Sequence, residues 1–223
     1  MKSTPELIVM LTHNDHTVAN AFEIFEACKD SSATHWGFKE EPLPLEQMQE
    51  LYRYMKACGK TTVLEVVAYE EDESLRGAHI AAECGVDILM GTIFSDEISA
   101  VCKECGITYM PFVGEISERP SVLRGSLESM VDQAKRVLER GADGIDLLGY
   151  RYTGDAVALN RDLVQAIDAP VCLAGSVNSV ERLNEVKDAN PWAFTIGGAF
   201  FEQRFGDSFA NQIDKVCAYM ADH

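Results

Sequence analysis

Positive charge is scarce in this chain of 223 residues. Lys and Arg number 19 against 36 Asp and Glu, so the formal net charge at pH 7 is −17. A protein of this sign is repelled by nucleic acid backbones and by anionic membrane surfaces. The composition therefore argues against nucleic acid or a membrane as a partner.

Long apolar runs are also missing. Near the start the longest covers residues 7–11, far short of the roughly 20 residues that a membrane helix needs. The seven cysteines are odd in number and scattered, with no secretory signal pattern before them. We therefore expect a cytoplasmic protein with reduced thiols. Cys102 and Cys105 lack a second pair at zinc-finger spacing, which favours core or surface thiols over metal or redox work.

What the sequence does contain is a regular alternation of two kinds of segment. Short apolar or β-branched runs are each followed by an amphipathic stretch, the pattern of βα units. Residues 45–58 and 127–138 show the spacing of helices with one apolar face. Glycines are placed to end helices just before strands, at Gly59, Gly85, Gly106 and Gly141. We predict eight strands, at about residues 7–13, 33–38, 61–69, 87–93, 107–113, 144–150, 170–175 and 192–197.

Eight successive βα units predict one closed (β/α)8 barrel, with residues 1–223 as a single domain. No Pro- or Ser-rich linker interrupts them. An open doubly wound sheet is the second choice, because residues 12–16, after the first strand, lack the glycines of a dinucleotide-binding turn. In a barrel, chemistry takes place on the loops after the carboxyl ends of the strands, so those loops supply the candidates.

The loops after strands seven and eight are rich in glycine. Gly175 and Ser176 follow strand seven, and Gly197 and Gly198 follow strand eight and open a short helical segment. Small residues let backbone N–H groups approach an oxyanion closely, and a helix N-terminus adds its dipole. We call these four residues the glycine cradle and predict that they bind phosphate. The alternative is that the glycines only let helix and strand pack tightly.

Residues 174–178 and 196–199 resemble the paired phosphate loops of the ribulose-phosphate-binding barrels. That group includes the histidine-biosynthesis isomerase and cyclase, indole-glycerol-phosphate synthase, pentulose-phosphate epimerase and N-acetylmannosamine-6-phosphate epimerase. The resemblance implies a phosphorylated sugar or sugar-like substrate. The amino-sugar epimerase pattern has an acidic residue before the loop-seven glycine and a lysine on strand three. This chain has Ala174 and Glu65 there, so the epimerase activity is not carried over.

Two charged residues stand out as candidate catalytic groups. Lys39 is the one lysine predicted at the carboxyl end of a strand, where it could form a Schiff base or act as an ammonium electrophile. The alternative is a solvated lysine neutralised by its acidic neighbours. Glu65 lies within an apolar strand, where an unpaired carboxylate costs several kcal/mol. An inter-strand salt bridge is its alternative role.

Further candidates follow the other strands. Asp146 and Glu115 are candidate acids or bases, although the sequence leaves open whether Asp146 points into the barrel. Arg119 and Arg151 could clamp a carboxylate or a second phosphate, or simply pair with the abundant acids. A metal at His13 and His16 is disfavoured, because no third ligand is placed. The predicted substrate-binding residues are His13, Asn14, Asp15, Arg119, Tyr150 and Arg151.

These patterns predict an enzyme acting on a small phosphorylated sugar-like metabolite, with neither metal nor other cofactor. Either an isomerase or epimerase working through an enediol, or an aldolase-type lyase, would need a phosphate anchor, a base and an electrophile. Glu65 would be the base and Lys39 the electrophile. The alternative is a non-catalytic regulatory barrel that binds a phosphorylated metabolite. The sequence leaves the oligomeric state open and is compatible with a homo-oligomer.

Overall fold

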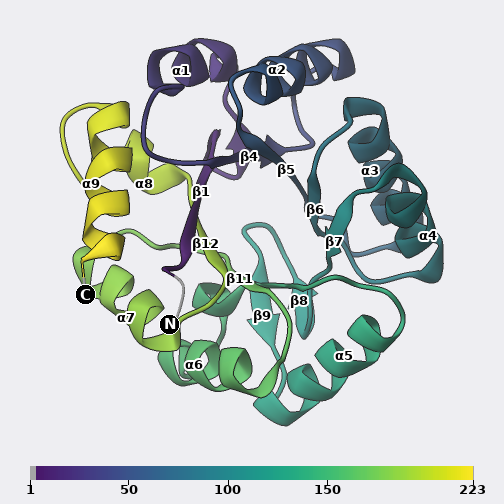
Figure 1. Cartoon of the computed structure of the whole chain (residues 1–223). Coiled ribbons are helices and arrows are strands. Elements are labelled where there is room, and N and C mark those ends of the chain that lie inside the picture. Colours follow the sequence, from purple (N-terminus) through teal and green to yellow (C-terminus); the bar gives the residue numbers. More distant parts are fainter. Residues whose placement is uncertain (1–3, 223) are drawn as a thin grey trace.

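The computed structural model describes residues 4–222 and contains a ring of parallel strands with helices around it (Figure 1). The eight strands that we predicted are all present and alternate with helices along the chain. Their bounds are β1 (Glu6–Met10), β4 (His35–Lys39), β5 (Thr61–Val66), β6 (Ile88–Gly91), β7 (Thr108–Met110), β10 (Ile145–Leu147), β11 (Val171–Leu173) and β12 (Ala193–Ile196).

The ring closes between β7 and β10. The other neighbouring strands pair in parallel in the order β10-β11-β12-β1-β4-β5-β6-β7. At the remaining junction Phe112 and Asp146 form an isolated parallel bridge, and the Asp146 N–H donates to the Pro111 carbonyl at 3.0 Å. The predicted (β/α)8 barrel is therefore confirmed, and the open sheet is not observed.

Helices cover the outside of the ring. Gly85 and Gly106 end α3 and α4 with φ of 62° and 68°. This is the left-handed conformation expected of the glycines that we placed at helix ends. None of the described helices is long and apolar enough to cross a membrane. The helices are α1 (Ala21–Cys28), α2 (Leu45–Ala57), α3 (Glu71–Cys84), α4 (Asp96–Cys105), α5 (Leu127–Glu139), η1 (Gly149–Arg151, a 3-10 turn), α6 (Ala156–Ala166), α7 (Val180–Ala189), α8 (Gly198–Phe201) and α9 (Phe209–Ala221).

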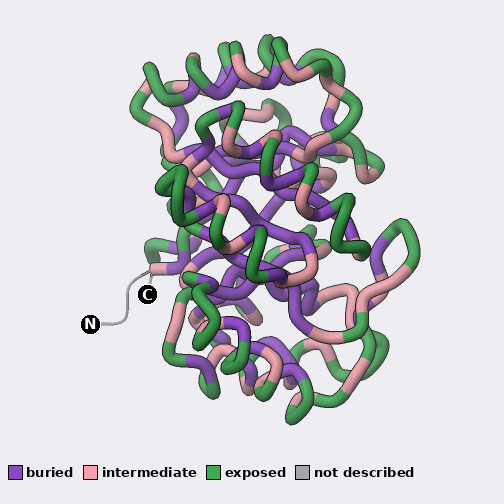
Figure 2. The backbone as a smooth tube through the Cα atoms, turned by 90° about the vertical axis from the view of Figure 1, so that its right-hand side faces the viewer, coloured by how far each residue is buried: buried purple, intermediate pink, exposed green. Residues whose placement is uncertain are grey.

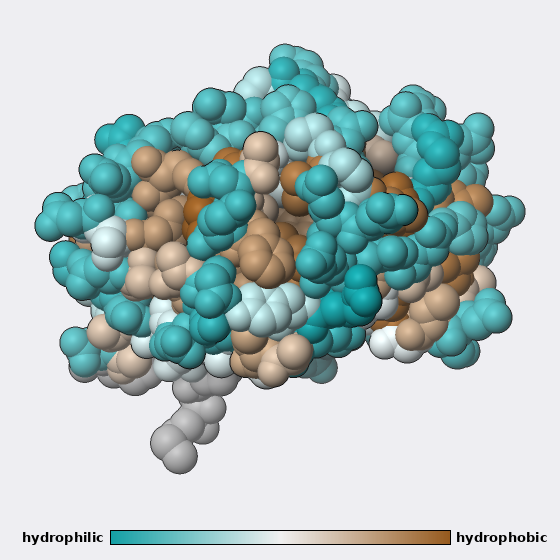
Figure 3. Space-filling model, turned by 90° about the horizontal axis from the view of Figure 1, so that it is seen from above, coloured by the Kyte–Doolittle hydropathy of each residue, from teal (hydrophilic) through white to brown (hydrophobic). Residues whose placement is uncertain are grey.

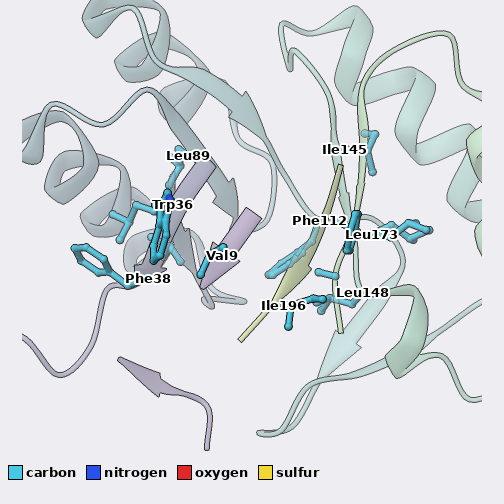
Figure 4. Packing of buried hydrophobic residues seen from close by; sticks show 14 of the residues in the cluster. Val9, Trp36, Phe38, Leu89, Phe112, Ile145, Leu148, Leu173 and Ile196 are labelled. Carbon is cyan, nitrogen blue, oxygen red and sulfur yellow. The ribbon is translucent and has the colours of Figure 1, made fainter. Parts of the chain in front are cut away.

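Two apolar layers pack on opposite faces of the strands. Outward-pointing residues such as Trp36 and Phe38 are fully buried between strands and helices (Figure 4). Inward-pointing residues, among them Val63 and Cys172, form a smaller cluster inside the barrel. Figure 2 shows buried backbone through the middle of the molecule and exposed backbone on the outer turns of the helices.

The inner layer decides which candidate residues face the barrel interior. Side chains alternate along a strand, so Glu65 shares the inward face with Val63. Asp146 lies opposite Cys172 in the β10–β11 register, whereas its neighbours Ile145 and Leu147 belong to the outer layer. Asp146 therefore points into the barrel, which the sequence could not decide.

Two small hairpins rise from the ends of the strands. β2 (Thr12–His13) pairs with β3 (His16–Thr17), and β8 (Glu115–Ser117) pairs with β9 (Val122–Arg124). The second hairpin occupies the long loop after β7 that we singled out in the sequence. Its tip is held to the loop after β5, since the Tyr69 hydroxyl lies 2.7 Å from Ser121 Oγ and donates to the Glu118 carbonyl at 3.1 Å.

The outer surface over α1 and α2 is mixed in polarity. Figure 3 looks onto this side and shows hydrophobic side chains gathered between hydrophilic ones. Phe22 on α1 is 40% exposed and stacks on Tyr54 of α2, with ring centroids 5.3 Å apart. Single exposed apolar residues of this kind are normal on a soluble surface.

Candidate functional site

A cavity of about 540 Å³ opens where the carboxyl ends of the strands meet. This volume lies in the range of small-molecule sites. The cavity brings together residues from the loops after strands at both ends of the chain. The predicted site residues that line it are His13, Asn14, Asp15, Lys39, Glu65, Arg119, Arg151, Gly175, Ser176, Gly197 and Gly198.

Charged side chains of alternating sign form the floor of this cavity. Lys39 and Glu65 are direct neighbours in the β4–β5 register, and Lys39 Nζ lies 4.0 Å from Glu65 Oε2. Lys39 Nζ also donates a hydrogen bond to Asp15 Oδ1. The Lys39 and Glu65 side chains are only 12% and 11% exposed. The ammonium is thus held between two carboxylates rather than extended into solvent.

The two carboxylates keep Lys39 charged. Burial by itself lowers the pKa of a lysine, because it disfavours the ammonium form. The charge of Glu65 and the hydrogen bond to Asp15 act in the opposite direction and prevail, so the pKa of Lys39 is raised above its usual value. Lys39 is therefore an ammonium at neutral pH, able to donate to an oxygen but not to attack as a free amine.

Asp146 lies inside the barrel beside this charged group. Its side chain is fully buried, and neither carboxyl oxygen has a hydrogen-bond partner among residues 4–222. Burial, followed by the negative charge of Glu65, raises its pKa well above the ordinary value. Asp146 therefore keeps its proton to a higher pH than an ordinary aspartate, and it does not line the cavity itself.

The glycine cradle forms one wall of the cavity. Within the described chain the backbone N–H groups of Gly175, Ser176 and Gly198 donate to no protein acceptor. Gly198 opens α8, whose single turn leaves its first N–H groups without helical partners. Free donors on both loops are what an oxyanion requires.

Tight packing accounts for only part of the glycine pattern. A Cβ at Gly197 would lie 2.7 Å from the Thr12 carbonyl oxygen, and one at Gly175, where φ is +118°, would lie 2.9 Å from Tyr150 Cβ. These two glycines are needed by the backbone and its neighbours. At Gly198 the nearest atom, His13 Cδ2, is 3.7 Å away. Packing therefore does not require glycine at this position.

Besides Asp146, two predicted site residues lie outside the cavity lining. Glu115 is exposed on β8, opposite Arg124 in the hairpin. Tyr150 lies behind Gly175, and its ring stacks against the Arg182 guanidinium, 4.1 Å from the ring centroid. Neither side chain is brought to the charged floor.

Some residues of the site were missed in the sequence. Thr195 and Ser121 line the cavity, but a threonine in a strand and a serine in a hairpin carry no distinctive signal. Glu40, which follows Lys39 directly, does not line the cavity itself. Its Oε2 is buried and has no hydrogen-bond partner among residues 4–222, and burial raises the pKa of Glu40 to about 7.

No protein-family model matches the chain, and no curated protein matches its sequence. Solved structures do match its backbone. One is a 4-hydroxy-2-oxoglutarate/2-dehydro-3-deoxyphosphogluconate aldolase from TTHB1, with 14% identity, a TM-score of 0.67 and coverage of 96% of this chain and 94% of that one. The chain is a TIM barrel.

Two further matches differ in their described roles. The N-acetylmannosamine-6-phosphate 2-epimerase of Clostridium perfringens has 14% identity and a TM-score of 0.62, covering 87% of this chain and 86% of that one. A glycerol uptake operon antiterminator regulatory protein of Listeria monocytogenes has 18% identity and a TM-score of 0.59, covering 88% and 93%. At such identities the likeness establishes the fold. The reaction has to be argued from the site.

Proposed function

We propose that this TIM barrel is an enzyme that moves a proton on a small phosphorylated sugar-like metabolite through an enediol intermediate. The observation that carries the proposal is the pairing of Lys39 with Glu65 on the floor of a cavity whose wall is the glycine cradle. Barrels of this architecture that act on phosphorylated sugars are among its structural relatives. The cradle would hold the phosphate, which leaves the other end of the substrate over the charged floor.

In this mechanism Glu65 is the base and Lys39 the electrophile. Glu65 takes the proton from the carbon next to the substrate carbonyl, and the electron pair moves to the carbonyl oxygen. The Lys39 ammonium donates to that oxygen and stabilises its developing negative charge. Lys39 passes a proton to this oxygen and takes one from the adjacent hydroxyl, whose oxygen becomes the new carbonyl. Glu65 returns its proton to the carbon of the original carbonyl, which gives the isomer. Asp15 keeps Lys39 charged and in position through its hydrogen bond.

The charge on Lys39 favours this route over an aldolase route through a Schiff base. A Schiff base requires a neutral amine that attacks the carbonyl carbon, and both neighbouring carboxylates favour the ammonium. The aldolase-type lyase is therefore the second candidate. A regulatory barrel that only binds its ligand is the third, supported by the antiterminator protein among the structural relatives.

Proton exchange with solvent tests the proposal. The protein is incubated in D2O with a panel of aldose and ketose phosphates, and deuterium incorporation next to the carbonyl is followed by NMR. Glu65→Gln and Lys39→Met should each slow exchange by roughly 10²- to 10⁴-fold while the dissociation constant of the phosphate ester changes little. Lys103→Met, on the outer helix α4, is the matched control and should behave as the wild type.

Two results would contradict the enediol mechanism. A substrate adduct on Lys39 after borohydride reduction would assign the aldolase route. Tight binding of a sugar phosphate, with no exchange or turnover of any compound in the panel, would favour the regulatory role.

A further inference from the structure

An arginine lies on the rim of the cavity opposite the glycine cradle. The cradle follows β11 and β12, and β5 stands four positions from β11 around the eight-stranded ring, half a turn away. Arg119, at the tip of the β8–β9 hairpin, donates from Nη2 to the Val67 carbonyl just beyond β5. Because Arg119 also lines the cavity, it lies across the charged floor from the loop that follows β11.

Arg119 has no acidic partner in a chain that is rich in acids. No salt bridge within residues 4–222 includes it, although the chain holds 36 Asp and Glu. Arg124 of the same hairpin does pair, with Glu118 at 2.8 Å. The nearby Glu40 is only partly ionised at neutral pH, since its pKa is about 7. The positive charge of Arg119 is therefore available to a ligand.

The hairpin tip that carries Arg119 is fixed in place. Ser121 is buried and lies within hydrogen-bond distance of the Tyr69 hydroxyl, at 2.7 Å, and the Glu118 carbonyl accepts from that hydroxyl. The chain is thus anchored on both sides of Arg119. Together with the hydrogen bond from Nη2 to the Val67 carbonyl, this anchoring reduces the conformational freedom that Arg119 loses when it binds an anion.

We propose that the substrate carries a carboxylate at the end remote from its phosphate, and that Arg119 binds this carboxylate. The inference rests on the proposed function, because the cradle must hold the phosphate for Arg119 to meet the other end. One arginine offers two parallel N–H donors, which match the two oxygens of a carboxylate. A second phosphate would call for several donors, as the cradle itself provides. The substrate class is therefore the phosphorylated sugar acids.

Arg151 lies on the same side of the cavity as the cradle, unlike Arg119. It follows β10, the neighbour of the cradle strand β11, lines the cavity and forms no salt bridge in the described chain. On that side it supplies the positive charge that the cradle lacks. Loss of Arg151 should weaken every phosphorylated ligand alike, whereas loss of Arg119 should weaken only those with a carboxylate.

Matched pairs of ligands test the proposal by calorimetry at constant ionic strength. The probes are glucose 6-phosphate against 6-phosphogluconate, ribose 5-phosphate against 5-phosphoribonate, and fructose 1,6-bisphosphate. The acid of at least one pair should bind roughly 10- to 100-fold more tightly than its sugar. Arg119→Gln should abolish this preference and leave the affinity for the sugar phosphate unchanged. Arg136→Gln, an exposed arginine on α5, removes the same charge as a control and should keep the preference.

Each alternative outcome has a distinct meaning. Equal affinity within both pairs, or equal losses for acid and sugar in Arg119→Gln, would overturn the carboxylate site but not the proposed function. Tighter binding of the bisphosphate than of either acid would assign a second phosphate to Arg119. Binding of none of these probes would overturn both proposals. If Arg119→Gln does not fold, Arg119→Lys keeps the charge without the paired donors and should lose most of the preference.

Discussion

Replacing Asp146 by asparagine should change how the stability of the protein depends on pH. The side chain is fully buried with no partner for either oxygen among the described residues, and burial together with the charge of Glu65 raises its pKa. In the unfolded chain an aspartate has an ordinary pKa near 3.9. Above that pH the unfolded chain releases the Asp146 proton, while the folded protein retains it.

The magnitude follows from proton linkage. In this window the folded state binds one proton more than the unfolded state, so the free energy of unfolding falls by about 1.4 kcal/mol for each pH unit. For a chain of this length each pH unit in the window corresponds to roughly 3 to 6 °C in melting temperature. The loss ends where the pH passes the raised pKa of the folded state.

Urea unfolding at pH 5, 6, 7 and 8 measures this effect. Asp146→Asn cannot ionise and should lose the part of the downward slope that Asp146 causes, so its stability relative to the wild type rises with pH. Asp146→Leu, which keeps the branched shape without a polar group, should show the same shallower profile. Asp168→Asn, an exposed aspartate, serves as the control and should follow the wild type. Parallel profiles for wild type and Asp146→Asn would refute the reasoning, because Asp146 would then titrate alike in both states.

Three further predictions concern the cradle, a neighbouring carboxyl and the core. Gly198→Ala should keep the affinity for a phosphate ester, because the nearest atom to an added Cβ is 3.7 Å away. Gly198→Leu should abolish that affinity, because the larger side chain would enter the cavity. Calorimetry with a bound sugar phosphate checks both variants. Burial raises the pKa of Glu40 to about 7, so Glu40 contributes a loss of stability that ends near pH 7. Glu40→Gln should remove this contribution, which the same urea series measures. Phe38→Ala should cost about 3 to 5 kcal/mol of unfolding free energy, because Phe38 is fully buried and stacks on Tyr52 at 4.2 Å; urea unfolding at one pH is sufficient.

The barrel could be predicted from the sequence because its signals are local. A run of apolar residues forms a buried strand, an amphipathic stretch forms a helix against it, and a glycine such as Gly85 or Gly106 ends that helix in a left-handed turn. Each of these elements depends on a few residues that are neighbours in the sequence, so it can be predicted from the sequence. The repetition of the unit then leaves few ways to arrange eight parallel strands.

The contacts among the candidate site residues could not be predicted from such local signals, because they join residues that are far apart in the sequence. Lys39 and Glu65 lie on the second and third predicted strands, which a barrel places side by side. The hydrogen bond from Lys39 to Asp15, in contrast, depends on how the β2–β3 hairpin folds over the strand ends. Glu115 has the residue type and loop position of a catalytic acid, yet the hairpin register turns it toward Arg124. Sequence position gives the loop on which a residue lies, and the loop conformation decides where the side chain goes.

The sequence by itself determined the alternation of strands and helices, the acidic net charge, and the glycines after strands seven and eight. These are properties of composition or of residues close together in the chain. Tertiary structure alone decided that Asp146 points inward, through its register with Cys172, and that Arg119 reaches the rim beyond β5. The physical reason is that burial and charge act through space. The protonation of a buried carboxyl and the availability of an arginine depend on which distant groups the fold places beside them.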